Sequence, residues 1–359
     1  MHDFLLELVR MVLDPAYNIN KVGGDWRRLF DLARRQGVTA MVMDAVGRLP
    51  QEARPEQPLR LQWIGQALTM ERSYAEHAAA IRQLAAVYAR HGIPMLLMKG
   101  YGCSRDYPVP QHRPTGDIDI YLFGRQQEAD EMMEREQGIA VHREYHKHST
   151  FRFQGVEVEN HAKFIDDITH KSNIRFEETL MQVLRTTECV AADMENVLLP
   201  SPSFNALFLL RHTGEHFASN EITLRHVLDV GTFFSAHHAD VDWALVHEVY
   251  RRERMTQFYD ALATICVDRL GMSPSAFHGY TPRPDLARRI LDDIFEEKEV
   301  LPMSTYGIRT IGQKLRYGIS KSRRWWRNRW KYRLVYNENL VEGFVRLARN
   351  RIKPLPTLP

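Results

Sequence analysis

The hydrophobic period of this chain changes twice, and these changes limit the folds that it can adopt. Apolar residues recur every three or four positions up to His91-Gly92, as they do in amphipathic helices. The run from Ile93 to Met98 is then continuously apolar and ends in Lys99-Gly100, as a buried strand entering a turn does. The helical period returns from Pro202 onward. We therefore expect a small sheet held between two helical regions.

Strand and helix patterns alternate within the middle part of the chain. Residues 116–122 alternate polar and apolar side chains with the period of a strand. A charged helical segment follows from Arg125 to Gly138, and residues 149–153 and 156–159 are typical of a hairpin that turns at Gln154-Gly155. The predicted fold class is α+β, with a small mixed sheet flanked by N-terminal and C-terminal helical regions.

A chain of 359 residues has room for two or three domains. The changes of period place the boundaries near residues 92, 200 and 300. We expect an N-terminal helical region at 1–92, an α/β core at 93–200, a C-terminal helical domain at 201–300 and a basic, aromatic-rich segment at 301–359.

The net charge of +3 conceals a polarised distribution. Residues 301–359 carry 14 Lys or Arg and two acids, a net charge of +12, whereas the preceding residues carry 34 and 43, a net charge of −9. The part from Arg309 to Arg333 holds ten of the basic residues, and the aromatic residues Trp325, Trp326, Trp330 and Tyr332 are interleaved with them. Such a segment can bind nucleic acid or an anionic membrane surface, or pack on the acidic body. We favour packing, because Trp326 and Trp330 are i and i+4 on a helix.

The N-terminal residues, the lengths of the apolar runs and the cysteines indicate the compartment in which the protein works. Two acids within the first seven residues break the pattern of a secretory leader, and no uncharged apolar run approaches the ~20 residues that cross a bilayer. Cys103, Cys189 and Cys266 are far apart and form no CxxC pair. We expect a soluble protein of the reducing cytoplasm.

Two carboxylates share one face of the predicted strand at 116–122. Asp117 and Asp119 are two positions apart, so both project to the same side, ~6.5–7 Å apart along the backbone. Such a pair can converge on a hard divalent cation, Mg²⁺ or Mn²⁺, which takes oxygen ligands. The structural alternative is two exposed acids on an edge strand.

A later strand offers a third carboxylate. Glu157 and Glu159 are again two positions apart and can face the Asp pair. Three carboxylates on neighbouring strands beside a glycine turn can hold two metal ions ~4 Å apart, the arrangement used for in-line displacement at phosphorus. The spacing alone leaves both Glu157 and Glu159 as candidates.

These motifs resemble the DNA polymerase beta-like nucleotidyltransferase superfamily. Leu97-Met98-Lys99-Gly100 followed by Arg113-Pro114-Thr115-Gly116-Asp117-Ile118-Asp119-Ile120 is most similar to its bacterial uncharacterised nucleotidyltransferase family, which has an LKG turn and an R-x-x-x-D-I-D-L stretch. The resemblance extends to Asp25–Val38, Glu159-Asn160-His161 and Leu224–Asp229, and covers roughly residues 25 to 235. It implies that the sheet is a nucleotidyltransferase core.

The resemblance also implies roles for particular residues. Asp117 and Asp119 match the metal-binding pair, and Glu159 matches the third carboxylate, which binds the catalytic metal and helps to activate the acceptor hydroxyl. Gly100 matches the turn glycine that lets backbone amides approach the triphosphate. The other residues expected at the NTP are Lys99, Gly102, Ser104, Arg113 and Gly116.

Two of these residues carry a positive charge, and for each of them a structural role is the alternative to phosphate binding. Lys99 would meet phosphate oxygens as a point charge, and Arg113 would meet them through its fork of donors. Alternatively, Lys99 is a surface residue at a strand end, and Arg113 forms an ion pair that orients Asp117.

The implied reaction is the transfer of an NMP from an NTP to an acceptor hydroxyl, with release of pyrophosphate and with Mg²⁺ or Mn²⁺ as cofactor. The acceptor would be a small molecule, a sugar or a peptide, with nucleic acid a further candidate through the basic segment. Tyr101 stands where the superfamily has Gly or Ser. This departure motivates an alternative, a binding or scaffold protein that keeps the nucleotidyltransferase fold without turnover.

His212-Thr213-Gly214-Glu215-His216 also matches the H-x-x-E-H motif of inverted zinc peptidases, in which two His bind zinc and Glu activates water. Glu296, Glu297 or Glu299 would supply the third ligand. Gly214 weakens the centre of a helix by ~1 kcal/mol. We therefore expect these histidines to lie near the cleft between sheet and helices, or to pack in the core.

Overall fold

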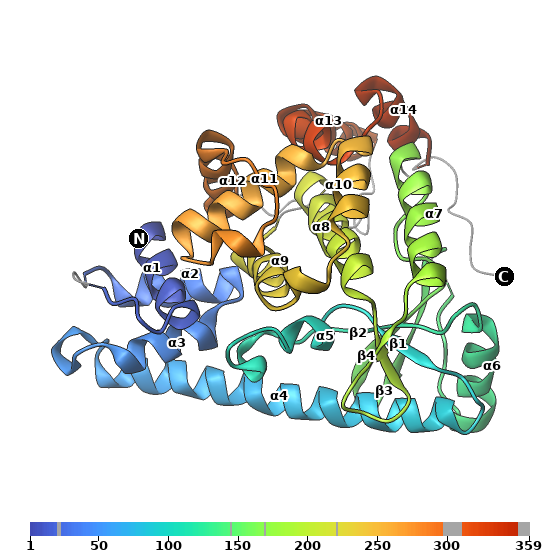
Figure 1. The fold of residues 1–359 in the computed structure, drawn as a ribbon, viewed down its shortest axis with the longest axis horizontal. Helices are drawn as coiled ribbons and strands as arrows, with labels where there is room; N and C mark the ends of the chain where they lie inside the picture. Colours follow the sequence, from blue (N-terminus) through green and yellow to red (C-terminus); the bar gives the residue numbers. More distant parts are fainter. Residues whose placement is uncertain (20–22, 144–145, 169, 220–221, 297–310, 351–359) are drawn as a thin grey trace.

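A computed structural model describes residues 1–19, 23–143, 146–168, 170–219, 222–296 and 311–350. The long helix α4 (Gln57–Ala89) runs along one side of the molecule, from the N-terminal helices to the sheet (Figure 1). Pro58 stands in its first turn, where the missing N–H leaves no helical hydrogen bond unmade. The helix can therefore begin at Gln57, directly before this proline.

Most of the other helices form two groups. The N-terminal group comprises α1 (His2–Leu13), α2 (Trp26–Gln36) and α3 (Thr39–Arg48). The C-terminal group comprises α8 (Pro202–Ser219), α9 (Leu224–His237), α10 (Trp243–Arg252), α11 (Thr256–Thr264), α12 (Pro284–Phe295), α13 (Ile311–Val335) and α14 (Leu340–Asn350). Among the described helices, none combines the length and the apolar composition that crossing a membrane requires.

The described residues form a six-stranded mixed sheet with the strand order β3-β4-β2-β1-β6-β5. Its strands are β1 (Met95–Leu97), β2 (Ile118–Tyr121), β3 (His148–Phe153), β4 (Val156–His161), β5 (Val190–Ala191) and β6 (Val197–Leu199). Strand β2 is parallel to β4 and antiparallel to β1. The predicted α+β class, a small mixed sheet between helical regions, is confirmed.

The hairpin of β3 and β4 turns where the sequence predicts. Gln154 and Gly155 form its two-residue turn, and both have positive φ angles of 51° and 81°. Such angles give the turn the right-handed twist of the strands that it joins. The turn fixes the register, so that Phe153 pairs with Val156 and, at the far end, His148 pairs with His161.

The sheet separates two apolar cores. Leu97, Ile118 and Ile120 belong to the core that the sheet shares with α4 and with α6 (Gln126–Gln137). Leu96 and Tyr121 belong to the other core, together with α7 (Lys171–Thr186) and the N-terminal and C-terminal helices. Because side chains alternate along a strand, the odd-numbered acids of the 117–121 segment lie on this second side.

The N-terminal and C-terminal helices share one core although they are far apart in sequence. The buried side chain of Gln36 at the end of α2 donates a hydrogen bond to Ile294 O (3.0 Å) and accepts one from Leu224 N (2.8 Å). It thereby links α2 to α12 and α9. The boundaries near residues 92 and 200 therefore separate types of secondary structure along the chain. That they also separate domains stays a proposal.

The structure describes part of the basic segment at 301–359, and two of its tryptophans differ in their burial. Trp330 meets the ring of Phe217 edge-on at 5.3 Å and lies under the Arg289 guanidinium at 3.9 Å. The next residue, Lys331, is buried and pairs with Asp293 at 2.5 Å. Trp326, one turn earlier, is 62% exposed. Packing on the body therefore involves the Trp330 end of α13, and Arg309 lies outside the described residues.

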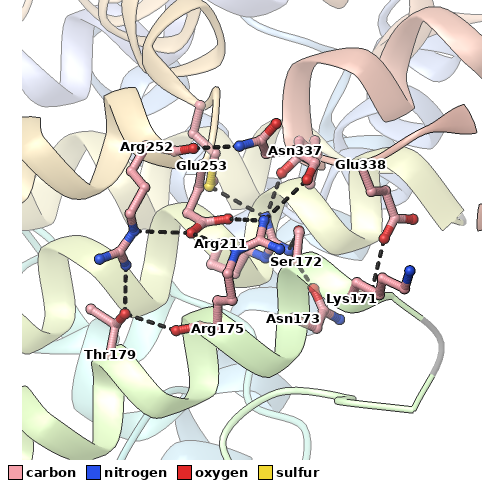
Figure 2. A network of polar contacts seen from close by, with 12 residues as sticks. Lys171, Ser172, Asn173, Arg175, Thr179, Arg211, Arg252, Glu253, Asn337 and Glu338 are labelled. Carbon is pink, nitrogen blue, oxygen red and sulfur yellow. Dashed lines mark hydrogen bonds and ion pairs between the residues drawn. The ribbon is translucent and has the colours of Figure 1, made fainter.

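Arg211 is fully buried at the meeting point of α7, α8 and α13 (Figure 2). Its guanidinium donates hydrogen bonds to Ser172 Oγ (2.5 Å), to Asn173 Oδ1 and to the carbonyl oxygen of Val335. The ring of Tyr336 lies 4.8 Å from the guanidinium carbon. We call these five residues the Arg211 cluster; it joins the C-terminal helices to the helix that covers the sheet.

Candidate active site

The sheet register brings three carboxylates together. Asp119 on β2 is the Cα partner of Glu159 on the parallel strand β4, and Asp117 precedes β2 on the same face. One carboxylate oxygen of each residue lies within 4.8 Å of the others. We call Asp117, Asp119 and Glu159 the carboxylate site.

Lys99 supplies a positive charge to this site. It follows β1, and its Nζ lies 2.7 Å from Asp119 Oδ1 and 3.9 Å from Glu159 Oε2. Burial alone lowers the pKa of the Lys99 ammonium, but the neighbouring carboxylates outweigh burial and raise that pKa above its usual value. Lys99 is therefore charged and faces the carboxylates, unlike the surface lysine of the structural alternative.

The two aspartates differ in their electrostatic surroundings. Burial raises the pKa of Asp119, but Lys99 and His161 overcome this effect and hold the pKa well below its usual range. Burial and the charge of Asp119 raise the pKa of Asp117. Asp119 is thus the fixed anion of the pair, and Asp117 is the carboxylate that gains most from an added cation.

One oxygen of the site lacks a protein partner. Asp119 is 1% exposed, and within the described residues its Oδ2 accepts no hydrogen bond. A buried carboxylate oxygen without a donor is costly, and a bound cation would supply the missing interaction. The oxygen donors of Asp117, Asp119 and Glu159 suit a hard divalent ion such as Mg²⁺ or Mn²⁺, so these residues fit the expected metal.

Glu159, and not Glu157, belongs to this arrangement. Glu157 lies two positions earlier on β4 and lines two surface cavities beside the hairpin. Burial raises the pKa of Glu159, whereas a hydrogen bond with His161 (3.2 Å) and the charge of Lys99 lower it, with a net lowering. The geometry thus favours the residue that the resemblance implies.

The turn after β1 has the geometry that requires glycine. Gly100 has a φ of 63° and a ψ of −113°, and a Cβ there would lie 3.3 Å from the carbonyl oxygen of Asp117. The short helix α5 (Tyr101–Ser104) begins directly after it. The glycine therefore allows the turn to approach the strand that carries Asp117.

Two predicted NTP contacts in this turn are already engaged. The amide of Gly102 donates to Lys99 O (3.1 Å), and the hydroxyl of the buried Ser104 donates to Tyr101 O (2.6 Å). These groups hold the turn together. As the structure stands, they are not directed at a ligand, because each is satisfied within the turn itself.

Arg113 forms an ion pair with an acid other than the predicted one. It is 5% exposed, and its Nε and Nη2 donate to the two oxygens of Asp229 on α9, at 2.8 and 2.9 Å. Tyr107 donates to the same carboxylate at 2.7 Å. A buried bidentate pair with Asp229 occupies the guanidinium. The acid that Arg113 pairs with is therefore Asp229 and not Asp117, and the phosphate contact stays a prediction.

A cavity of about 620 Å³ opens beside Asp117. It lies between α4 and the β3–β4 hairpin, and Gly116 lines it next to Asp117. The Gly116 carbonyl oxygen is 2.6 Å from His77 Nε2, so α4 holds the start of β2 in place. Its charged lining residues are Glu76, Asp117, Arg152 and Glu157.

Two histidines extend the site beyond the predicted residues. His161 Nε2 lies 3.0 Å from Asp119 Oδ1 and 3.2 Å from Glu159 Oε2, and His148 Nδ1 lies 3.4 Å from the same Glu159 oxygen. The sequence reasoning used His161 only as part of a motif and did not single out His148. Counting outward from the Gln154-Gly155 turn pairs the two histidines, so the signal was present.

The H-x-x-E-H motif of α8 does not form a metal site with its own glutamate. Glu215 accepts a hydrogen bond from Asn173 Nδ2 at 2.5 Å. Among the described residues, the groups with metal-ligand spacing include neither His212 nor His216. Their rings stack edge to face, 4.6 Å apart, and burial lowers the pKa of His216 to about 4. This geometry argues against the zinc-peptidase alternative; Glu297 and Glu299 lie outside the described residues.

The mixed sheet with its strand-end turn and its carboxylates defines a nucleotidyltransferase core. The family described as "Uncharacterised nucleotidyltransferase" matches residues 23–271, more than half of the chain. The chain belongs to this family. Comparison with curated proteins gave no significant match, and comparison with solved structures gave none either.

Proposed function

We propose that this protein transfers a nucleoside monophosphate from an NTP to an acceptor hydroxyl, with release of pyrophosphate. The observation that supports this reaction most strongly is the carboxylate site, whose three oxygens lie within 4.8 Å of one another. Asp119 Oδ2 is buried there and has no hydrogen-bond partner in the described part of the chain. Asp117, Asp119 and Glu159 would hold Mg²⁺ or Mn²⁺. Such an ion stabilises the charge that develops on phosphoryl oxygens.

Lys99 and the Gly100 turn would receive the triphosphate. The Lys99 ammonium already neutralises part of the charge of Asp119 and Glu159. An anionic substrate at this point gains the same attraction, because the ammonium has three donors and its Asp119 contact uses one of them. Gly100 lets the chain approach closely here, since it has no side chain.

Glu159 is the residue proposed to accept the proton of the acceptor hydroxyl. Its carboxylate is held by His161 at 3.2 Å and is 19% exposed, so that an acceptor can reach it. The bond from the acceptor oxygen to the α-phosphorus forms while the bond to the pyrophosphate oxygen breaks. The hydroxyl proton passes to Glu159.

The cavity beside Asp117 is the proposed acceptor site. Its volume of about 620 Å³ suits a small molecule, a sugar or the end of a peptide. Nucleic acid remains a second candidate acceptor, supported only by the basic character of residues 301–359. We place the reaction in the cytoplasm, where NTPs are available and where free thiols such as those of Cys103 and Cys266 persist.

One observation favours a second candidate function, NTP binding without transfer. The Gly102 amide and the Ser104 hydroxyl are bonded within the turn, and Tyr101 replaces the small residue that usually follows the glycine. A protein with this turn could bind a nucleotide through its metal and release it unchanged.

Label transfer distinguishes the two functions. The full-length protein is incubated with each α-labelled NTP, Mg²⁺ or Mn²⁺ and a metabolite extract, and the label is followed into new products. We expect labelled product with one class of acceptor, and Glu159→Gln should bind NTP but form none. Glu178→Gln, an exposed glutamate on α7, is the matched control and should retain transfer. NTP binding without any labelled product would support the second function.

A further inference from the structure

Two histidines face each other across the β3–β4 hairpin, next to the carboxylate site. His148 and His161 are Cα partners in the antiparallel pair, and their ring centroids are 5.0 Å apart. Glu159 lies two residues before His161, so it projects from the same face of β4. Three side chains from one rigid hairpin therefore converge on one point.

The distances between their polar atoms match those around a metal ion. Glu159 Oε2 lies 3.4 Å from His148 Nδ1 and 3.2 Å from His161 Nε2, and all three ligand atoms lie within 4.8 Å of one another. Ligands that bind zinc at about 2.0–2.1 Å in a tetrahedral shell are separated by roughly 3.3 Å. The three atoms thus need little movement to share an ion.

The other ring nitrogen of His161 fixes its orientation. Its Nδ1 is 3.0 Å from Lys163 O, and a carbonyl oxygen only accepts, so Nδ1 carries the hydrogen. Nε2 then faces Glu159 and Asp119, and a metal ion would take the place of the hydrogen that Nε2 shares with these carboxylates. A carbonyl that holds the second nitrogen is the usual support of a metal-bound histidine.

We propose that His148, Glu159 and His161 bind a borderline divalent transition-metal ion, with Zn²⁺ the best fit. Two imidazole nitrogens and one carboxylate oxygen suit zinc, whereas Mg²⁺ takes oxygen ligands. The side chains of His148 and Glu159 are 15% and 19% exposed, so a fourth position stays open to water or substrate. We call this the histidine site; it shares Glu159 with the carboxylate site but none of its aspartates.

Cobalt reports on this site without any assay of transfer. Metal-free, full-length protein is titrated with Co²⁺ in excess Mg²⁺, and the visible absorption of four-coordinate Co²⁺ is recorded. We expect one equivalent to bind and to be displaced by Zn²⁺. Because His148 contributes a ligand, His148→Gln should weaken Co²⁺ binding at least about 100-fold. His142→Gln, an exposed histidine of the same segment, should bind as the wild type does.

The aspartates separate this inference from the proposed function. Asp117→Asn should lose Mg–NTP binding and keep the Co²⁺ spectrum, whereas His148→Gln should keep Mg–NTP binding, which also shows that it is folded. A wild-type protein without the four-coordinate spectrum would overturn the inference, as would a spectrum that survives in His148→Gln. Failure of Mg–NTP binding with an intact Co²⁺ spectrum would overturn the proposed function alone.

Discussion

The carboxylate site and the Arg211 cluster both hold charge away from water, but they balance it differently. At the carboxylate site, three acids share one lysine, Lys99, and Asp119 keeps an oxygen without a hydrogen-bond donor among the described residues. In the Arg211 cluster, a single guanidinium donates its hydrogen bonds to neutral oxygens (Figure 2). The ring of Tyr336 lies 4.8 Å from the guanidinium carbon.

The difference indicates that the carboxylate site binds a ligand and that the Arg211 cluster stabilises the fold. An excess of like charge costs stability unless a ligand compensates it, so its retention indicates a site. A buried cation on one helix whose partners come from two others contributes to the docking of all three, and its loss leaves those partners unpaired. The predictions below test whether the two clusters separate in this way, from the largest expected effect to the smallest.

Asp117→Asn should reduce nucleotidyl transfer about 10³-fold, which corresponds to the several kcal/mol that a metal ion supplies to phosphoryl charge. An amide lacks the charge that offsets a divalent cation. The melting temperature of the metal-free variant should not fall, because one of three neighbouring like charges is removed. Calorimetry of Mg–NTP binding and thermal melting measure the two effects. Unchanged Mg–NTP affinity would show that the site is assigned wrongly.

Arg211→Met should lower the free energy of unfolding by about 3–5 kcal/mol, because Ser172, Asn173 and the Val335 carbonyl lose their donor while the volume is largely kept. Denaturant titration measures the loss, with the exposed Arg251→Met as the matched control. If the variant is as stable as the control, the cluster does not dock α13 on the body.

Glu177 on α7 should make the stability of the protein depend on pH. Burial raises its pKa to about 7, although the amides of Phe164 and Ile165 donate to it. The folded state then binds more protons than the unfolded state between pH 4.5 and 7. The resulting stabilisation of the folded state is complete below pH 4.5 and is lost as the pH rises through 7.

Glu177→Gln should therefore raise the melting temperature at pH 8 and change it little at pH 5. The full shift of the Glu177 pKa corresponds to at most about 3 kcal/mol of folding free energy. The gain in stability of the variant is smaller, because an amide offers one acceptor oxygen in place of two. Melting curves at both pH values test the sign. If the melting temperature of the variant, relative to that of the wild type, is lower at pH 8 than at pH 5, this prediction is wrong.

Two tryptophans one helical turn apart give the smallest effects. Trp330→Ala should cost about 2 kcal/mol, because its ring packs on Phe217 and under Arg289. Trp326→Ala should change stability by less than about 0.5 kcal/mol, since Trp326 is largely exposed. Equal losses in the two variants would mean that the whole of α13 packs on the body.

The sequence predicted the parts of the site that depend on strand period. The alternation around Asp117 and Asp119, and that around Glu159, placed the three acids on one side before any tertiary contact was known. The hairpin turn at Gln154-Gly155 was equally readable, because few residue pairs tolerate its positive φ angles. These features are local, so the pattern of neighbouring residues determines them.

Contacts between distant segments were not predictable in the same way. Arg113 and Asp229 are 116 positions apart, and their pair depends on how α9 packs against the loop before β2. The different exposure of Trp326 and Trp330 depends likewise on which face of α13 meets α8 and α12. Such partners follow from tertiary packing, which a single sequence does not reveal.

The position of Lys99 has a consequence for the order in which the site assembles. Lys99 is 20 positions from Asp119, and Asp119 is 40 positions from Glu159. Closing the shorter loop costs about 0.6 kcal/mol less entropy, and β1 and β2 form an antiparallel pair that needs no crossover. We expect the ammonium to reach Asp119 before the second strand delivers Glu159. The nascent sheet would then meet its third carboxylate with a counter-charge already in place, so that electrostatic repulsion does not slow the pairing of β2 with β4.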